Sequence, residues 1–143
     1  MTEARRYPSR PFVGVGVVVW RGAEVLLVRR GHAPRAGQWS LPGGLQELGE
    51  TVFETARREV REETGLTVSI VGLIDVIDSI HRDDNGRIEY HYTLVDVTAE
   101  WVAGDAHAGD DAAALTWADP DDFARFDLWD ETVRVIGLSA RAR

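Results

Sequence analysis

Residues 51–65 read TVFETARREVREETG and have the start and stop signals of one uninterrupted α-helix. Thr51 and Glu54 fit a capping box at its beginning, and Gly65 suits the position just after its end. Neither proline nor glycine interrupts Val52 to Thr64. The sequence therefore predicts a helix over Val52 to Thr64, a single rigid element that carries an unusual density of acidic side chains.

Three glutamates lie three and four positions apart on this helix, namely Glu59, Glu62 and Glu63. At about 100° per residue, Glu59 and Glu63 fall at the edge of the apolar stripe of the helix. An unpaired carboxylate there is costly to desolvate, and a hard divalent cation removes this cost. Carboxylate oxygens with free water positions suit Mg²⁺, which usually shares its remaining ligands with substrate phosphates. The pattern therefore indicates a metal site for phosphate chemistry.

The alternative is a surface helix stabilised by ion pairs, in which Glu and Arg three or four positions apart contribute about 0.2–0.5 kcal/mol per pair. This interpretation suits Glu54 with Arg57 and Arg58, which are expected with Arg61 on the solvated side. It does not explain acids at the edge of the apolar stripe.

Residues 44–66 also resemble the signature of the Nudix hydrolases. That signature is Gly, five residues, Glu, seven residues, Arg-Glu, an aliphatic residue, any residue, Glu-Glu, any residue, Gly and an aliphatic residue. Every specified position matches, and the matching residues are Gly44, Glu50, Arg58, Glu59, Val60, Glu62, Glu63, Gly65 and Leu66. The preceding Leu41-Pro42-Gly43 is common in the family.

The resemblance implies a role for most of these residues. The three glutamates would ligate Mg²⁺ or Mn²⁺, and the carbonyl group of Gly43 would add a ligand. Glu50 and Arg58 would pair and brace the loop against the helix. The resemblance extends over roughly Phe12 to Ile136 and implies the Nudix α/β/α sandwich with a mixed central sheet.

Composition limits the classes of protein to consider. With 143 residues, of which 44% are hydrophobic, one compact domain with its own core is expected. The chain has no cysteine, which excludes disulfides and thiolate sites and is compatible with a reducing cytoplasm. A net charge of −8 argues against a nucleic-acid-binding surface. No apolar run approaches the length of a membrane span, and a homodimer is left open.

Strand and turn signals organise the rest of the chain. Residues 1–11 are expected to form a flexible or weakly docked leader, and one domain to run over residues 12–143. The expected strands are Phe12 to Trp20, Val25 to Arg30, Thr67 to Ile80, Ile88 to Thr98 and Ala114 to Trp117. The turn at residues 83–86 (DDNG) joins the third and fourth of these into a long hairpin.

A closing helix is expected over Asp130 to Ala140, with Val133, Ile136 and Gly137 facing inward. Strands interleaved with two helices suit a three-layer α/β/α sandwich around a mixed sheet. The element order and the family resemblance therefore agree on the fold.

The chemistry implied is attack of water on a diphosphate bridge, which gives a nucleoside monophosphate and a phosphorylated product. Glu62 or Glu63 is the first choice of proton acceptor. In several Nudix enzymes an acid from a downstream loop is base or metal ligand, and Asp110 and Asp111, followed by Asp105, match that description. Solvation of an ordinary turn is the alternative for these three residues.

Substrate contacts are expected from three places. Arg29 and Arg30 would hold the distal phosphate or ribose, with only one of them facing the site because side chains alternate along a strand. Gly44 would let the backbone approach the phosphates closely, although a tight turn also explains it. Trp129 and Asp130 begin the last helix, where some Nudix enzymes recognise a base.

The substrate itself is less constrained. Tyr90 or Tyr92 is an alternative stacking partner for a base, and core packing is the alternative for every such aromatic residue. The lead-in RRGHAPRAGQWSLPGG looks most like that of small ADP-ribose pyrophosphatases, so ADP-ribose or another nucleotide sugar is the first expectation. The proline that such members often carry about sixteen residues past the signature is Arg82 here. An oxidised nucleoside triphosphate is the second expectation, and a catalytically silent nucleotide sensor the third.

Overall fold

The computed structural model describes residues 4–31, 35–109 and 112–143. Within these ranges the chain forms a seven-stranded sheet. Its strands are β1 (Phe12–Arg21), β2 (Glu24–Arg30), β3 (Trp39–Ser40), β4 (Gly43–Leu45), β5 (Thr67–Arg82), β6 (Ile88–Ala103) and β7 (Ala112–Ala118). The order is β3-β2-β1-β6-β5, with β4 paired to β1 and β7 paired to β2. The sheet is mixed, because β1 and β6 run parallel whereas the other pairs are antiparallel.

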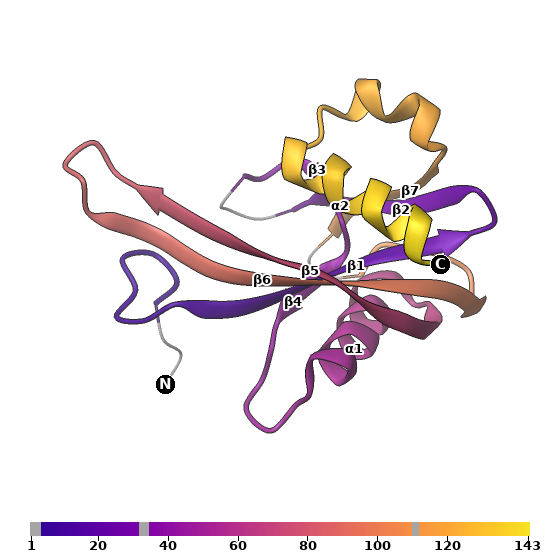
Figure 1. Cartoon of the computed structure of the whole chain (residues 1–143), viewed down its shortest axis with the longest axis horizontal. Coiled ribbons are helices and arrows are strands. Elements are labelled where there is room, and N and C mark those ends of the chain that lie inside the picture. Colours follow the sequence, from indigo (N-terminus) through magenta and orange to yellow (C-terminus); the bar gives the residue numbers. More distant parts are fainter. Residues whose placement is uncertain (1–3, 32–34, 110–111) are drawn as a thin grey trace.

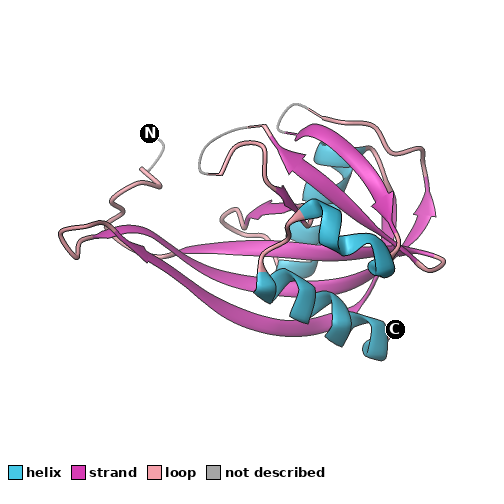
Figure 2. Ribbon diagram, turned by 90° about the horizontal axis from the view of Figure 1, so that it is seen from above, coloured by secondary structure: helices cyan, strands magenta, loops and turns pink. Residues whose placement is uncertain are grey.

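Helices cover both faces of the sheet (Figures 1 and 2). Helix α1 (Val52–Thr64) lies on one face, and α2 (Asp130–Ala142) lies on the other with the 3₁₀ helix η1 (Pro120–Phe126) beside it. Side chains alternate along β1, so that Val17 packs in the core under α1 while Val18 and Trp20 pack under α2. The predicted α/β/α sandwich with a mixed central sheet is confirmed.

Two elements are placed differently from the prediction. Gly44, for which a tight turn is the alternative explanation, lies with Gly43 in β4, which pairs with β1 so that Gly43 lies opposite Gly16. In α2, Ile136 faces inward as expected, but Val133 is 44% exposed and Gly137 is also exposed. The inward face of α2 instead carries Val135, Ile136 and Ser139.

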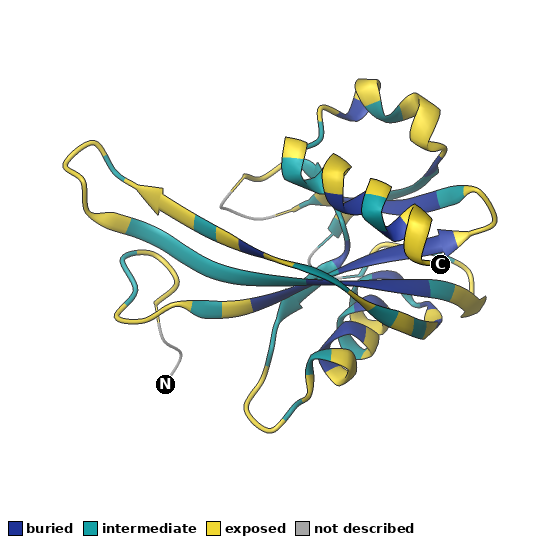
Figure 3. Cartoon of the chain, in the orientation of Figure 1, coloured by how far each residue is buried: buried dark blue, intermediate teal, exposed yellow. Residues whose placement is uncertain are grey.

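The long hairpin is confirmed and extends well beyond the two helices, where the end of β5 and the turn are mostly exposed and β6 is half-buried (Figure 3). Its turn is held by Asp83, whose carboxylate accepts hydrogen bonds from the backbone N–H groups of Asn85 and Arg87. The leader touches this end of the hairpin (Figure 1), because the Tyr7 hydroxyl donates to Asp83 at 2.7 Å and Arg6 pairs with Glu89 at 2.8 Å. Leader flexibility and the domain limits stay predictions.

No helix in the described ranges combines the length and the apolar character needed to cross a membrane.

Candidate active site

Helix α1 has the ends that its sequence predicts. The Thr51 hydroxyl accepts from the N–H of Glu54 at 3.1 Å, and the Glu54 carboxylate accepts from the N–H of Thr51 at 2.9 Å. Gly65 closes the helix in the left-handed region, with φ 77°. Ala56 and Val60 are fully buried against the sheet. The acidic side chains are therefore carried by a helix that is fixed at both ends and along one face.

Arg58 joins this helix to the loop before it. Its Nε donates to Glu50 at 2.6 Å and its Nη2 donates to the other Glu50 oxygen at 2.9 Å and to the Leu45 carbonyl at 3.0 Å. The Arg58 hydrogen bonds, followed by one from the Glu47 N–H, lower the pKa of Glu50 to about 2. Fully buried Thr55 also donates to Glu50, a contact that sequence reasoning missed.

The same guanidinium also contacts two of the signature glutamates. Its Nη1 donates to Glu59 at 2.8 Å and to Glu62 at 3.2 Å. The Arg58 side chain is only 21% exposed, so its expected place on the solvated side of the helix is wrong. The pKa of Arg58 is raised above its usual value, chiefly by the hydrogen bond to Glu50. This residue holds the loop and the acidic cluster in one arrangement.

Glu59 lies directly against the backbone of β4. A Cβ atom at Gly44 would collide with the Glu59 carboxylate, so glycine allows this close approach. The Glu59 side chain is 16% exposed, compared with 59% for that of Glu62. Glu59 and Glu63 line a cleft together with Gly43 and Gly44, whereas Glu62 is not among its lining residues.

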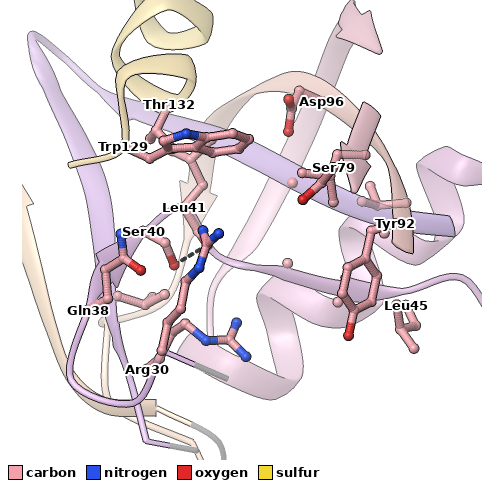
Figure 4. A pocket seen from close by; sticks show the side chains of 18 of the residues that line it. Arg30, Gln38, Ser40, Leu41, Leu45, Ser79, Tyr92, Asp96, Trp129 and Thr132 are labelled. Atoms are coloured by element: carbon pink, nitrogen blue, oxygen red, sulfur yellow. Dashed lines mark hydrogen bonds between the residues drawn. The ribbon is translucent and has the colours of Figure 1, made fainter. Parts of the chain in front are cut away.

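This cleft has a volume of about 740 Å³ (Figure 4). Among the described residues, its lining includes basic side chains from four positions, Arg5, Arg29, Arg30 and Arg35. It also includes the aromatic residues Trp39, Tyr90, Tyr92 and Trp129. One open volume thus combines carboxylates, guanidinium groups and flat aromatic rings in a chain whose net charge is −8.

Both arginines at the end of β2 border the cleft, so the expectation that only one would face it is wrong. The pairing of β2 with β7 shifts register between Arg29 and Arg30. Such an irregularity interrupts the strict alternation of side chains along a strand. The Arg29 guanidinium lies 5.9 Å from the centre of the Trp39 ring.

Several expected residues lie elsewhere. Asp130 is exposed and is not among the residues that line the cleft, whereas its neighbour Trp129 is. Asp105 is exposed on its loop. Asp110 and Asp111 lie outside the described residues. The N–H of Gly109 donates to the Glu63 carbonyl at 2.8 Å, so the loop before them reaches the C-terminal end of α1.

The acids do not form a closed metal cage. In the part of the chain that the structure describes, no three Asp, Glu or His side chains converge tightly enough to hold an ion by themselves. Mg²⁺ is usually bound by one or two carboxylates that share it with substrate phosphates. The hard oxygen ligands of Glu59, Glu63 and Gly43 at one cleft fit such an ion.

Sequence reasoning missed one acid of this cleft, Asp96 on β6. Asp96 lies opposite Gly16 of β1 and is only 6% exposed. Burial, followed by the negative charge of Asp75, raises the pKa of Asp96 to about 7. The sequence feature that could have identified Asp96 is a single aspartate inside the otherwise apolar stretch L-V-D-V of an expected strand.

Comparisons with known proteins agree with this architecture. The NUDIX domain model matches residues 10–136. A MutT NUDIX hydrolase from Burkholderia pseudomallei superposes with a TM-score of 0.77 and 30% identity, over 91% of this chain and 98% of that one. The chain therefore belongs to the Nudix hydrolase family, whose members generally need a divalent metal ion.

Two sequence relatives carry different activities in their names. An ADP-ribose pyrophosphatase from Methanocaldococcus jannaschii is 37% identical over 76% of this chain and 62% of its own length. A putative 8-oxo-dGTP diphosphatase from Bacillus subtilis is 32% identical over 73% of this chain and 63% of its own length. The chain spans less than two thirds of the length of either relative.

Proposed function

We propose that this protein hydrolyses the diphosphate bridge of a nucleoside diphosphate derivative, with ADP-ribose or another ADP-sugar as the first substrate. The products are a nucleoside monophosphate and a phosphorylated sugar. The observation that carries the proposal is the cleft in which Glu59 and Glu63 share one open volume with four arginines of the described chain. A diphosphate with a bound cation needs carboxylates to hold the cation and guanidinium groups to bind the phosphate oxygens.

Each group has a separate task. Arg29 and Arg30 bind the phosphate oxygens and orient the bridge, because a guanidinium presents a planar fork that matches phosphate geometry. Glu59 and Glu63, with the Gly43 carbonyl, would hold Mg²⁺ or Mn²⁺. Such an ion would supply neutralisation of phosphate charge and a lower pKa of water. Arg58 sets the position of Glu59 through its 2.8 Å hydrogen bond.

The proton of the attacking water goes to a carboxylate. Glu63 is our first choice because it lines the cleft, whereas Glu62 does not and its side chain is 59% exposed. Asp110 and Asp111 stay predictions for the same task. They are tested by Asp110→Asn and Asp111→Asn, each of which lowers kcat by about 10²-fold if that residue is the base.

The name of the Methanocaldococcus jannaschii relative supports ADP-ribose. The name of the Bacillus subtilis relative supports a second candidate, an oxidised deoxynucleoside triphosphate. A nucleotide sensor without turnover is the third. The cleft itself is compatible with any small nucleotide, so the choice between them depends on measured rates.

The experiment is a substrate panel with the purified chain, read by product chromatography in Mg²⁺, in Mn²⁺ and in chelator. ADP-ribose should give AMP and ribose 5-phosphate only when metal is present. A higher kcat/KM for 8-oxo-dGTP, with release of its monophosphate, would favour the second candidate. Absence of turnover with ADP-ribose, ADP-glucose, GDP-glucose and 8-oxo-dGTP would contradict the enzyme proposal and favour the sensor.

A further inference from the structure

Two of the signature glutamates, Glu62 and Glu63, stand in the last turn of α1, just before its final residue, Thr64. The last four C=O groups of an α-helix have no partner inside the helix, and helix ends tend to fray. Glu63 also lines the cleft. A side chain in this turn can keep a fixed position at the cleft only if groups outside the helix bind these carbonyl groups.

The loop of residues 104–109, between β6 and β7, supplies such partners. The His107 N–H donates to the Thr64 carbonyl at 3.0 Å. The Gly109 N–H donates to the Glu63 carbonyl at 2.8 Å. Two of the last carbonyl groups of α1 are thus bound by a segment that is distant in the sequence, which restrains the backbone of Glu63 directly.

Glycines allow the loop to lie directly on the end of the helix. A Cβ atom at Gly109 would collide with the Glu62 carbonyl, and one at Gly65 would collide with the His107 ring. A Cβ atom at Gly104 would approach the Gly65 carbonyl to 2.9 Å. The loop and the helix end therefore fit each other without space for a further side chain at any of these three glycines.

We propose that Gly109 and His107 are positioning residues for the cation site, and that docking of the 104–109 loop and binding of the cation strengthen each other. The inference rests on the proposed function, because it takes Glu63 as a ligand of Mg²⁺ or Mn²⁺. The loop restrains the Glu63 backbone, and a cation bound by the Glu63 side chain restrains the same residue. Each event therefore lowers the cost of the other, and the coupling is reciprocal.

The test compares Gly109→Ala with Gly72→Ala, since both glycines lie outside the left-handed region of backbone conformation. The added Cβ atom collides with the Glu62 carbonyl in the first variant and meets nothing within 4 Å in the second. Calorimetric titration with Mn²⁺, and melting with and without Mn²⁺, are measured without nucleotide. Gly109→Ala should weaken Mn²⁺ binding by about fivefold or more and reduce the rise in Tm that Mn²⁺ produces. Gly72→Ala should match wild type in both measurements.

These measurements separate a positioning role from a purely structural one. A loop that only stabilises the fold would lower the Tm of metal-free Gly109→Ala and leave its Mn²⁺ affinity as in wild type, and this result would overturn the proposal. Absence of Mn²⁺ binding by wild type would contradict the cation site itself, and the inference with it. Neither measurement requires turnover, so failure of the coupling is distinguishable from failure of the hydrolase proposal.

If Gly109→Ala does not fold, hydrogen exchange in wild type decides. Mg²⁺ should slow exchange of the His107 and Gly109 amides by about fivefold or more, as measured by NMR. The Gly86 amide is the control, because it also donates to a backbone carbonyl, that of Asp83 at 3.0 Å, but lies in the hairpin turn. Its exchange should not change. Exchange of the two loop amides that Mg²⁺ leaves unchanged, or slows no more than that of Gly86, would overturn the proposal.

Discussion

Arg58 and Glu50 are joined by two parallel hydrogen bonds, from Nε at 2.6 Å and from Nη2 at 2.9 Å. The remaining amino group of the same guanidinium reaches Glu59 at 2.8 Å. The pair therefore ties the loop before α1 to a carboxylate that lines the cleft. Because the guanidinium group is planar and rigid, movement of Glu50 is transmitted to Glu59 through one side chain.

Arg58→Lys should lower kcat by about 10²-fold, because one ammonium group cannot reproduce the fork and a small displacement of reacting groups has an effect of that order. The measurement is steady-state kinetics with ADP-ribose, accompanied by thermal melting. Arg57→Lys is the control, since Arg57 is exposed on the same helix. If the two variants retain equal activity, Arg58 does not position the site.

Gly44→Ala should strongly reduce turnover, because the added Cβ collides with the Glu59 carboxylate. Gly72→Ala on β5 is the matched control, since a Cβ there meets nothing within 4 Å. Kinetics and metal titration of both variants provide the measurement. Unchanged metal affinity in Gly44→Ala would show that the close contact between Gly44 and Glu59 has no role in the site.

Asp96 should make the stability of the protein depend on pH. Its folded-state pKa of about 7 lies above the usual 3.8, so the folded state binds the proton more tightly than the unfolded state does. The stability gained by protonation is complete below pH 4 and is lost as pH rises through 7. Integrated over this window, the loss is about 4 kcal/mol, at roughly 1.4 kcal/mol per pKa unit.

Asp96→Asn removes this titration. It should therefore be more stable than wild type at pH 8 and similar to it at pH 4, as measured by urea unfolding at both values. A difference between the two proteins that is the same at pH 4 and pH 8 would contradict the raised pKa.

Features that depend on local sequence were predictable. The ends of α1 follow from Thr51, Glu54 and Gly65, which act within one or two turns of the helix. The hairpin turn likewise follows from residues 83–86, where Asp83 binds the backbone of its own turn. In both places the interacting groups are close in the chain, so spacing alone specifies the geometry.

Features that depend on distant pairing were not predictable. Gly43 and Gly44 look like a turn in isolation and become a strand only because β1 offers Gly16 and Val15 as partners. The buried environment of Asp96 depends on its parallel neighbour Gly16, eighty residues away in the sequence. Register of this kind is decided by the assembled sheet and leaves no periodic signal in either segment.

A cation site formed by the acids of α1 is tested most directly by comparing Glu63→Gln with Glu54→Gln. The two changes are of the same size on the same helix, but Glu63 lines the cleft whereas Glu54 caps the helix. Binding of Mn²⁺, kcat and the melting temperature of the metal-free protein should be measured for both. Glu63→Gln should lose most turnover and metal affinity with little change in melting. Glu54→Gln should keep turnover and metal affinity and should melt at a lower temperature. Equal, mild effects of the two variants on all three measurements would contradict the metal site.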